Sequence, residues 1–496
     1  MSIDSSEPTR SAQEASAEIH RPTRRKVIVG AASLTGMALA GVALRRLGRD
    51  GGIGEGKPRS RLVASSATVP SEVDVVVIGG GNVGCFTALE LAERGLRVAI
   101  CEKGVIAGEA SGRSLGYIDG LMLDPVKIPL IARAKQLWTG VSARVGADVG
   151  YRQTGVAALF SSPDLLAEGA SWVQAMKDVP ASDARVLSQA QVAALVPEVS
   201  GRFAGAVYEA TDGIAEPQLF ASAVAEKVRQ LGGSILQFCA VRGIETNGGK
   251  VSAVVTEKGR IGCDTVVLAG GVWSPVMARS LGLDLPQFMA FGSVARLSPT
   301  PGPKVSTLLA DETIVMRRNI AGGYDICHGV GVAPLTPDII RNLSRLRPAM
   351  QSMWDSLTPV INVPTFFELW RIPSQWRLDE SSPFEKHRIL APDIARDEST
   401  LAVQRTKSAF PGLAAATVTE NWSGILTSTP DNMPVISAVP TIPGMFVGSG
   451  FYYGLTMAPA AGEALADLVT GHTPRFDLMN YRMSRFSDGS PIVFRA

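Results

Sequence analysis

A run dominated by β-branched residues at 74–78 opens the clearest pattern in the chain. Strands buried on both faces lose the alternation of apolar and polar positions, so this run predicts an interior strand of a parallel sheet. Helical periodicity follows from about Asn82 to Arg94 and ends at Gly95, a residue that commonly terminates helices. A second apolar strand is expected at 97–100. The pattern therefore predicts a strand–helix–strand unit.

Glycines at defined positions join the first strand to the helix. Gly79 permits the tight turn, Gly81 lets the backbone approach a pyrophosphate, and Gly84 allows helix and strand to pack closely. The helix N-terminus offers backbone N–H groups and a positive dipole to phosphate. Glu102 lies 21 residues after Gly81, where a carboxylate accepts the ribose hydroxyls. We interpret the unit as a dinucleotide site rather than a glycine-rich turn alone. Glu at this position argues against NADP but does not separate FAD from NAD.

Beyond this unit, helix-like and strand-like segments alternate irregularly, which predicts a second region built on a mixed sheet. A further buried strand is expected at 264–268. The other expected helices lie near 124–144, 164–178 and 338–357, and the other expected strands lie near 288–298, 312–329 and 365–372.

Composition narrows the classes of function. A chain of 496 residues predicts two or three domains, and 46 % hydrophobic against 19 % charged residues excludes disorder over most of it. The 48 basic and 46 acidic residues give a net charge of +2, which does not favour a nucleic-acid partner. The five cysteines show no metal-ligand spacing and there are only four histidines. We expect buried thiols and no metal site.

The N-terminal region resembles a targeting segment. Arg24-Arg25 precedes an uncharged stretch at 27–44, and Arg45-Arg46 follows it. This arrangement resembles a twin-arginine export signal, and a single membrane anchor is the alternative. We therefore expect a signal region over 1–50, a linker over 51–72, the twin-arginine machinery as a partner, and a bacterial periplasm or cell-envelope location. An uncleaved signal would also associate the protein with the membrane.

Several motifs together resemble the D-amino-acid oxidase (DAO-type) superfamily of FAD-dependent oxidoreductases, which includes glycine oxidase, sarcosine oxidase and D-arginine dehydrogenase. They occur in the family's order at 108–116, 264–274, 427–436, 445–450 and 454–459. The resemblance implies an α/β protein, α+β overall, with a Rossmann-like FAD-binding domain made of discontinuous segments and an inserted mixed-sheet substrate domain. The FAD-binding segments would be 73–130, 205–285 and 405–475, the substrate domain 131–204 and 286–404, and the C-terminal tail 476–496.

The resemblance also assigns the cofactor residues. Asp431, in a Thr-Pro-Asp turn, would brace the flavin loops, although such a residue also simply forms turns. A glycine stands near where sarcosine oxidases carry their flavin-linked cysteine, and 105–120 lacks histidine, so the FAD is expected to be noncovalent. The expected FAD-binding residues are Gly79, Gly81, Asn82, Val83, Gly84, Glu102, Lys103, Ser111, Gly112, Arg113, Gly116, Val241, Ala269, Gly270, Trp273, Gly450, Gly454, Leu455 and Thr456.

Leu426 marks a departure from the family. Many members place an arginine there to bind the substrate carboxylate, a task suited to the planar guanidinium. Either another arginine serves here or the substrate lacks a carboxylate. The candidates are Arg317, Arg318 and Arg371. Because adjacent strand residues face opposite ways, one of Arg317 and Arg318 must point inward, unless both lie at the sheet edge.

Other substrate-site candidates are aromatic or titratable. Tyr117 follows the 108–116 motif, which we call the first flavin loop, and Tyr452 and Tyr453 precede the last expected helix. These tyrosines would line a substrate cage or fill core space. His328 is a candidate base, with a satisfied core histidine as the alternative.

Three functions remain open at this point. The first is oxidation of the C–N bond of an amino acid or secondary amine by hydride transfer to flavin N5, with oxygen or a quinone as electron acceptor. The second is oxidation of a hydroxy acid on the same FAD. The third is a non-catalytic FAD-binding assembly factor.

Overall fold

A computed structural model describes residues 52–177, 182–199, 202–300, 307–328, 331–352 and 357–495. The expected signal region therefore lies outside the described residues. Within the described ranges, no helix combines the length and apolar character needed to cross a bilayer.

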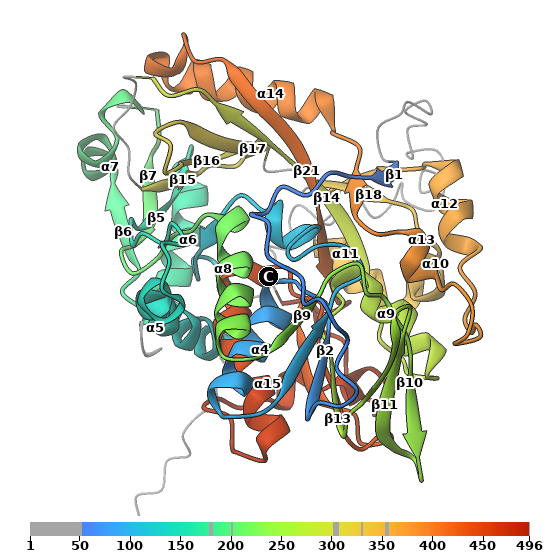
Figure 1. Cartoon of the computed structure of the whole chain (residues 1–496). Coiled ribbons are helices and arrows are strands. Elements are labelled where there is room, and N and C mark those ends of the chain that lie inside the picture. The colour runs from blue at the N-terminus through green and yellow to red at the C-terminus, as the bar shows by residue number, and fades with distance from the viewer. Residues whose placement is uncertain are drawn as a thin grey trace, which may run out of the picture.

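A six-stranded sheet forms the centre of the cofactor domain, in the lower half of Figure 1. All its neighbouring strands pair in parallel except the edge strand β22, which is antiparallel to β23. In spatial order the strands are β22 (Val435–Ala438), β23 (Met445–Ser449), β13 (Thr265–Leu268), β2 (Val75–Ile78), β3 (Val98–Cys101) and β9 (Ser234–Leu236).

Both faces of this sheet are covered, as the apolar run predicts. Val75 and Val77 pack into a core with helices α4 (Asn82–Glu93), α8 (Pro217–Gln230) and α15 (Gly454–Thr470). Val76 and Ile78 face the opposite core. That second core is closed by a three-stranded antiparallel sheet of β10 (Val241–Asn247), β11 (Lys250–Thr256) and β12 (Gly259–Gly262). The predicted strand–glycine–helix–strand unit is confirmed, and each end of its strands and helix lies within one residue of the predicted position.

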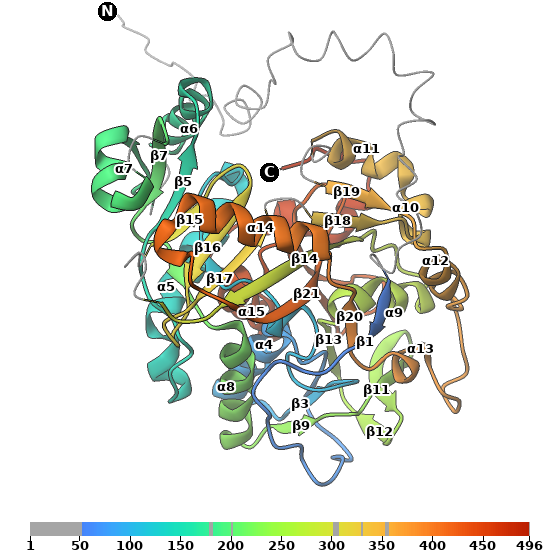
Figure 2. The same ribbon diagram turned by 90° about the horizontal axis from the view of Figure 1, so that it is seen from above.

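A mixed ten-stranded sheet makes up most of the second region, above the first in Figure 1. Its longest pairing joins β14 to β21 in antiparallel register from Phe288–Ser428 to Leu297–Val418. Helix α14 (Arg396–Ala409) lies across the outer face of this sheet (Figure 2). Along the main path the strands are β19 (Leu357–Val360), β18 (Gly331–Pro334), β14 (Phe288–Leu297), β17 (Tyr324–His328), β16 (Ile314–Arg318), β15 (Leu308–Ala310), β5 (Val156–Phe160), β7 (Gly205–Glu209) and β6 (Arg185–Ser188), with β21 (Val418–Ser428) beside β14.

The remaining elements connect or flank these sheets. A short ribbon of β4 (Tyr117–Ile118) and β8 (Gly213–Ile214) lies between the two regions, and β1 (Ile53–Glu55) pairs with β20 (Leu390–Pro392). The other helices are α5 (Ile128–Val145), α6 (Pro163–Met176), α7 (Gln189–Leu195), α9 (Ser274–Ser280), α10 (Pro337–Arg341), α11 (Leu343–Ser352), α12 (Val363–Trp370) and α13 (Pro383–Lys386).

Two expectations about local structure are wrong. The segment expected as a strand at 365–372 is largely helix α12, which begins because the Asn362 side chain accepts a hydrogen bond from the backbone N–H of Thr365 and caps it. The expected linker over 51–72 is bonded to the domain core across 52–66, a stretch we call the N-terminal strap. For example, the Ser66 N–H donates to the carbonyl of Ile235 at 2.7 Å.

The segment boundaries also differ from the expected division. Strands β7 and β21 fall inside the expected FAD-binding segments 205–285 and 405–475, but both belong to the ten-stranded sheet. The two inserts therefore extend further along the chain than expected, to Glu209 and to Ser428.

Candidate active site

One cavity, with a volume of about 370 Å³, lies between the two regions. One part is lined by the glycine-rich turn, the end of β3, the turn after β13 and the start of α15. Another part is lined by strands β14, β16, β17 and β21 of the large sheet. The cavity therefore touches both the expected cofactor domain and the expected substrate domain.

The glycines of the first turn are required by close backbone approach. Gly79 has φ +111°, and a Cβ there would lie 2.4 Å from the Ala269 carbonyl oxygen. A Cβ on Gly84 would lie 2.1 Å from the Gly79 carbonyl oxygen. Gly84 therefore serves the packing of α4 against the turn, and it does not line the cavity, whereas Gly79 and Gly81 do.

The carboxylate of Glu102 is held by backbone N–H groups on both sides. Its Oε2 accepts from Gly80 at 2.8 Å and its Oε1 from Gly104 at 2.7 Å. Burial raises the pKa of Glu102, and the nearby Lys103 and these two hydrogen bonds oppose that rise. Glu102 lines the cavity at the end of β3, where the sequence places the ribose.

Unpaired polar atoms in the cavity wall provide a test of the expected cofactor. Among the described residues, Asn82 Oδ1 and Ser114 Oγ are buried without a hydrogen-bond partner, and both residues line the cavity. The N-cap residue of α4, Gly81, has no capping side chain, and the first turn holds no acidic residue. The Ser111 hydroxyl accepts a hydrogen bond from the Asn82 N–H at 2.9 Å. Buried polar groups are nearly always satisfied. The wall therefore fits a polar, anionic ligand at the helix N-terminus, as the pyrophosphate of FAD would be.

Arg113 occupies a different role from the expected one. It is buried, and its guanidinium donates to the carbonyl oxygens of Lys57 at 2.6 Å, Gly108 at 3.2 Å and Ser423 at 3.3 Å. Arg113 therefore does not form a surface salt bridge, and its guanidinium is not free to bind a phosphate through all of its N–H groups. Arg113 instead joins the N-terminal strap, the first flavin loop and β21 while still lining the cavity.

Most of the other expected FAD residues also lie in the wall. Lys103 donates to Glu109 Oε1 and to the carbonyls of His387 and Arg388. Gly112 and Gly116 lie behind the wall. Residues that line the cavity as expected are Gly79, Gly81, Asn82, Val83, Glu102, Lys103, Ser111, Arg113, Val241, Ala269, Gly270, Trp273, Gly450, Gly454, Leu455 and Thr456.

The part of the cavity formed by the large sheet is apolar and aromatic. Tyr117, Tyr452 and Tyr453 line it, and Leu426 stands in the wall where many family members carry arginine. Burial raises the pKa of all three tyrosines, so their hydroxyls stay protonated at neutral pH and act as hydrogen-bond donors. Sequence reasoning missed several apolar wall residues, because their distance from the motifs in the chain gives no local signal: Val294, Val315, Cys327 and Leu357.

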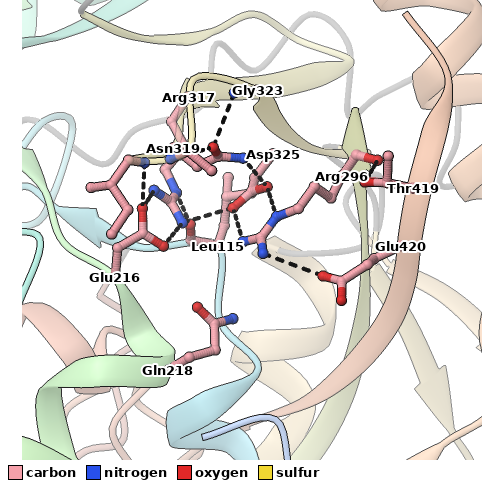
Figure 3. A network of polar contacts seen from close by, with 12 residues as sticks. Leu115, Glu216, Gln218, Arg296, Arg317, Asn319, Gly323, Asp325, Thr419 and Glu420 are labelled. Atoms are coloured by element: carbon pink, nitrogen blue, oxygen red, sulfur yellow. Dashed lines mark hydrogen bonds and ion pairs between the residues drawn. The ribbon is translucent and has the colours of Figure 1, made fainter. Parts of the chain in front are cut away.

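Arg317 does not serve as the expected carboxylate anchor. Its fully buried guanidinium contacts Glu216 Oε1 at 2.7 Å and Asp325 Oδ2 at 2.7 Å, and it also donates to the Leu115 carbonyl (Figure 3). Two carboxylates thus already neutralise this arginine, and it does not line the cavity. The predicted inward orientation of one member of the 317–318 pair is correct, and Arg318 is exposed.

The two remaining candidates are also displaced from the expected roles. Arg371 is exposed at the C-terminal end of α12, outside the cavity wall. His328 lines the cavity, but its Nε2 lies 3.1 Å from Arg405 Nη1 on α14, which covers the outer face of the sheet. The contact with α14 occupies this ring nitrogen and disfavours a role as substrate base.

Comparisons with known proteins agree with this geometry. A family model described as DAO, FAD dependent oxidoreductase, matches residues 74–468. Glycine oxidase of Pseudomonas putida is 26 % identical over 82 % of this chain and 97 % of that protein, and sarcosine oxidase subunit beta of Arthrobacter is 26 % identical over 84 % and 91 %. The structure of L-amino acid deaminase from Proteus myxofaciens in complex with anthranilate has a TM-score of 0.86 and 33 % identity, covering 89 % of this chain and all of that one.

Proposed function

Because the chain belongs to the DAO family of FAD-dependent oxidoreductases, we propose that it oxidises the C–N bond of a secondary amine or amino acid with an apolar side chain. The product imine would then be hydrolysed by water. The observation that carries the substrate class is the wall of the large-sheet part of the cavity, where Leu426 stands in place of the family's arginine and three tyrosines lie nearby. The similar proteins named above are, by their names, enzymes of amines and amino acids.

The residues of this chain prepare the reaction by binding and orientation. Bound FAD supplies the hydride acceptor. The glycine turn, Glu102 and the start of α4 hold the dinucleotide, and the start of α15 presents backbone N–H groups to the cavity. The apolar wall excludes water and packs an apolar side chain of the substrate. Tyr117 and Tyr453 keep their protons and donate hydrogen bonds that fix the orientation of the substrate.

A donor panel tests this proposal. The purified holoenzyme is mixed without oxygen with apolar, polar and acidic amino acids, secondary amines and hydroxy acids, and loss of flavin absorbance is followed. We expect apolar amino acids or secondary amines to reduce the flavin. Reduction by hydroxy acids alone would instead identify a C–O oxidoreductase, and bound FAD that no donor reduces would identify a non-catalytic factor.

Substitutions at Leu426 sharpen the test. Leu426→Arg places a charge in the wall where many family members carry the carboxylate-binding arginine, so we expect reduction by apolar amines without a carboxylate to fall by ~100-fold and donors with a carboxylate to gain relative to them. Val418→Ala on the same strand is the matched control, because Val418 is exposed and far along β21 from the cavity. An unchanged donor preference in Leu426→Arg would contradict the proposal that this wall selects the substrate.

We propose in addition that the protein is exported by the twin-arginine route and passes electrons to a membrane quinone. The support is the Arg24-Arg25 pair before the uncharged stretch at 27–44. Cell fractionation of the full chain and of an Arg24→Lys, Arg25→Lys double variant tests the route, since the variant should stay in the cytoplasm. Stoichiometric peroxide formation during turnover would contradict the quinone and indicate oxygen as the acceptor.

A further inference from the structure

A line of ion pairs runs from the N-terminal strap, through the large sheet, to the start of helix α8. Figure 3 shows its part from Glu420 to Glu216. Positive and negative groups alternate along it, so the line neutralises itself. In spatial order its members are Arg59, Glu420, Arg296, Asp325, Arg317 and Glu216. The successive N–O distances are 2.7, 3.2, 2.7, 2.7 and 2.7 Å.

Burial increases towards the Arg317 end of the line. The side chains of Arg317 and Asp325 are fully buried, and that of Glu216 is 5 % exposed. Asn319 Nδ2 donates to Asp325 Oδ1 at 3.0 Å, and the Ile320 N–H donates to Glu216 Oε1 at 3.1 Å. Each buried charge therefore has several partners, as a stable buried network requires.

Arg317 also forms a hydrogen bond with the backbone just before Tyr117. Its Nε donates to the Leu115 carbonyl, and Gly116 follows with φ +104°. A Cβ on Gly116 would lie 2.8 Å from Arg317 Nε and 2.4 Å from the Ala215 carbonyl oxygen. The loop is thus pressed directly against the guanidinium, and only glycine fits between them.

The same arginine fixes the partner strand of Tyr117. Tyr117 pairs with Ile214 in the β4–β8 ribbon, and Glu216 follows β8 as the N-cap residue of α8. Arg317 therefore holds the residue two before Tyr117 and the residue two after Ile214. The ring of Tyr117 lines the cavity, whereas Arg317 does not.

We propose that Arg317 is a positioning residue that sets the place of Tyr117 in the cavity wall by clamping both strands of the β4–β8 ribbon to the large sheet. The argument concerns the architecture of the wall, and its kinetic consequence rests on the proposed function. Small displacements of an orienting group cost reaction rate steeply, by roughly 100-fold for about 1 Å.

Arg317→Lys separates clamping from charge balance. A single ammonium group can stay near Glu216 and Asp325, but it cannot also reproduce the planar fork that reaches the Leu115 carbonyl. Arg318→Lys on the adjacent, exposed position is the matched control. Both variants are purified as the full-length holoenzyme, and FAD content, thermal unfolding and the visible circular dichroism of the bound flavin are measured.

We expect Arg317→Lys to keep FAD while its flavin dichroism changes and its rate of flavin reduction by the best donor falls by ~10-fold or more with little change in donor affinity. Arg318→Lys should match the parent in all measurements. A parental dichroism and rate in Arg317→Lys would overturn the proposal. If no donor reduces even the parent, the proposed function fails, while the dichroism still decides the positioning role.

A double-substitution cycle tests whether the effect travels through Tyr117. Arg317→Lys is combined with Tyr117→Ala, and reduction rates and dichroism are compared with those of the single variants. If Arg317 acts by placing Tyr117, its substitution should have little further effect once that ring is gone. Fully additive effects would show that Arg317 supports the fold without positioning Tyr117. Loss of folding in Arg317→Lys would count against the proposal as well, because the proposal expects that variant to fold.

Discussion

The guanidinium of Arg485 forms an ion pair with the carboxylate of Asp431, with Nε 2.7 Å from Oδ2. The carboxylate also accepts hydrogen bonds from the Thr429 hydroxyl and the Met433 N–H. These contacts brace the Thr-Pro-Asp turn itself, and the expected role of Asp431 toward the flavin loops stays a prediction. They also tie the C-terminal tail to the turn that precedes β22.

Asp431→Ala should therefore destabilise the protein strongly. The two side chains are 11 % and 6 % exposed, and removing one partner of such a pair leaves a buried charge, at a cost of about 3–5 kcal/mol. Chemical unfolding monitored by circular dichroism measures the change. Asp379→Ala is the control, since Asp379 and its partner Arg377 are 66 % and 70 % exposed, and it should leave the midpoint unchanged. Equal effects of the two substitutions would contradict the prediction.

Glu102→Gln should weaken cofactor binding. The amide keeps the size of the side chain but offers one acceptor oxygen where the carboxylate offers two to Gly80 and Gly104. The amide likewise lacks the charge with which Glu102 would accept the ribose hydroxyls, and loss of one such charge-assisted hydrogen bond, worth about 1.5–3 kcal/mol, predicts FAD affinity lower by ~10–100-fold. Titration of apoprotein with FAD, followed by flavin fluorescence, measures it. Glu245→Gln, at an exposed ion pair with Arg260, should bind FAD as the parent does.

Lys127 should make stability depend on alkaline pH. Its side chain is fully buried, and burial lowers its pKa from 10.5 to about 7. Between these values the unfolded chain holds a proton that the native protein lacks, so the free energy of unfolding should rise with pH, by about 1.4 kcal/mol per unit at most. The rise should end near pH 10.5 and be absent below pH 7.

Denaturant unfolding between pH 6 and 10 measures this dependence. Lys127→Met should flatten the curve because it removes the titrating group, and substitution of the exposed Lys250 by Gln serves as the control. A slope that survives in Lys127→Met would assign the pH dependence to other groups.

The N-terminal strap should retain the cofactor. Lys57 offers its carbonyl to Arg113 at 2.6 Å, and the Ser60 hydroxyl donates to the Ile106 carbonyl at 2.6 Å. Deleting residues 1–61 removes both bonds from the first flavin loop, so FAD should dissociate ~30-fold faster at about 1 kcal/mol lost per bond. Deleting only residues 1–51 keeps both bonds and should leave the rate unchanged. Gel filtration with absorbance at flavin wavelengths gives the retained fraction, and equal loss from both truncations would contradict the role of the strap.

Local rules explain which parts of this protein the sequence predicts well. The run at 74–78, the glycines and Glu102 lie close together in the chain, and each follows from backbone geometry within a few residues. The sequence predicts a linker in place of the strap because the bonds of the strap run largely through backbone groups and short polar side chains, which leave no apolar pattern. It predicts a strand in place of helix α12 because Phe and Trp residues favour strands, although Asn362 is a helix-capping signal.

For the candidate site, Arg317 shows where prediction from the sequence ends. Alternation along a strand correctly predicts an inward guanidinium. It cannot reveal that Glu216, 101 residues away, and Asp325, 8 residues away, would occupy that guanidinium. The apolar wall at Val294, Val315 and Leu357 likewise depends on long-range strand pairing that no local pattern specifies.

Strand β21 has a practical consequence for protein engineering. It pairs with β14 along its whole length, so one strand from late in the chain completes a sheet whose other members come from much earlier segments. A chimera that exchanges only the middle of the chain for that of a homologue would pair a foreign β14 with the native β21. Recombination libraries should therefore transfer the two strands as a single block, with one crossover point before Phe288 and the other beyond Ser428.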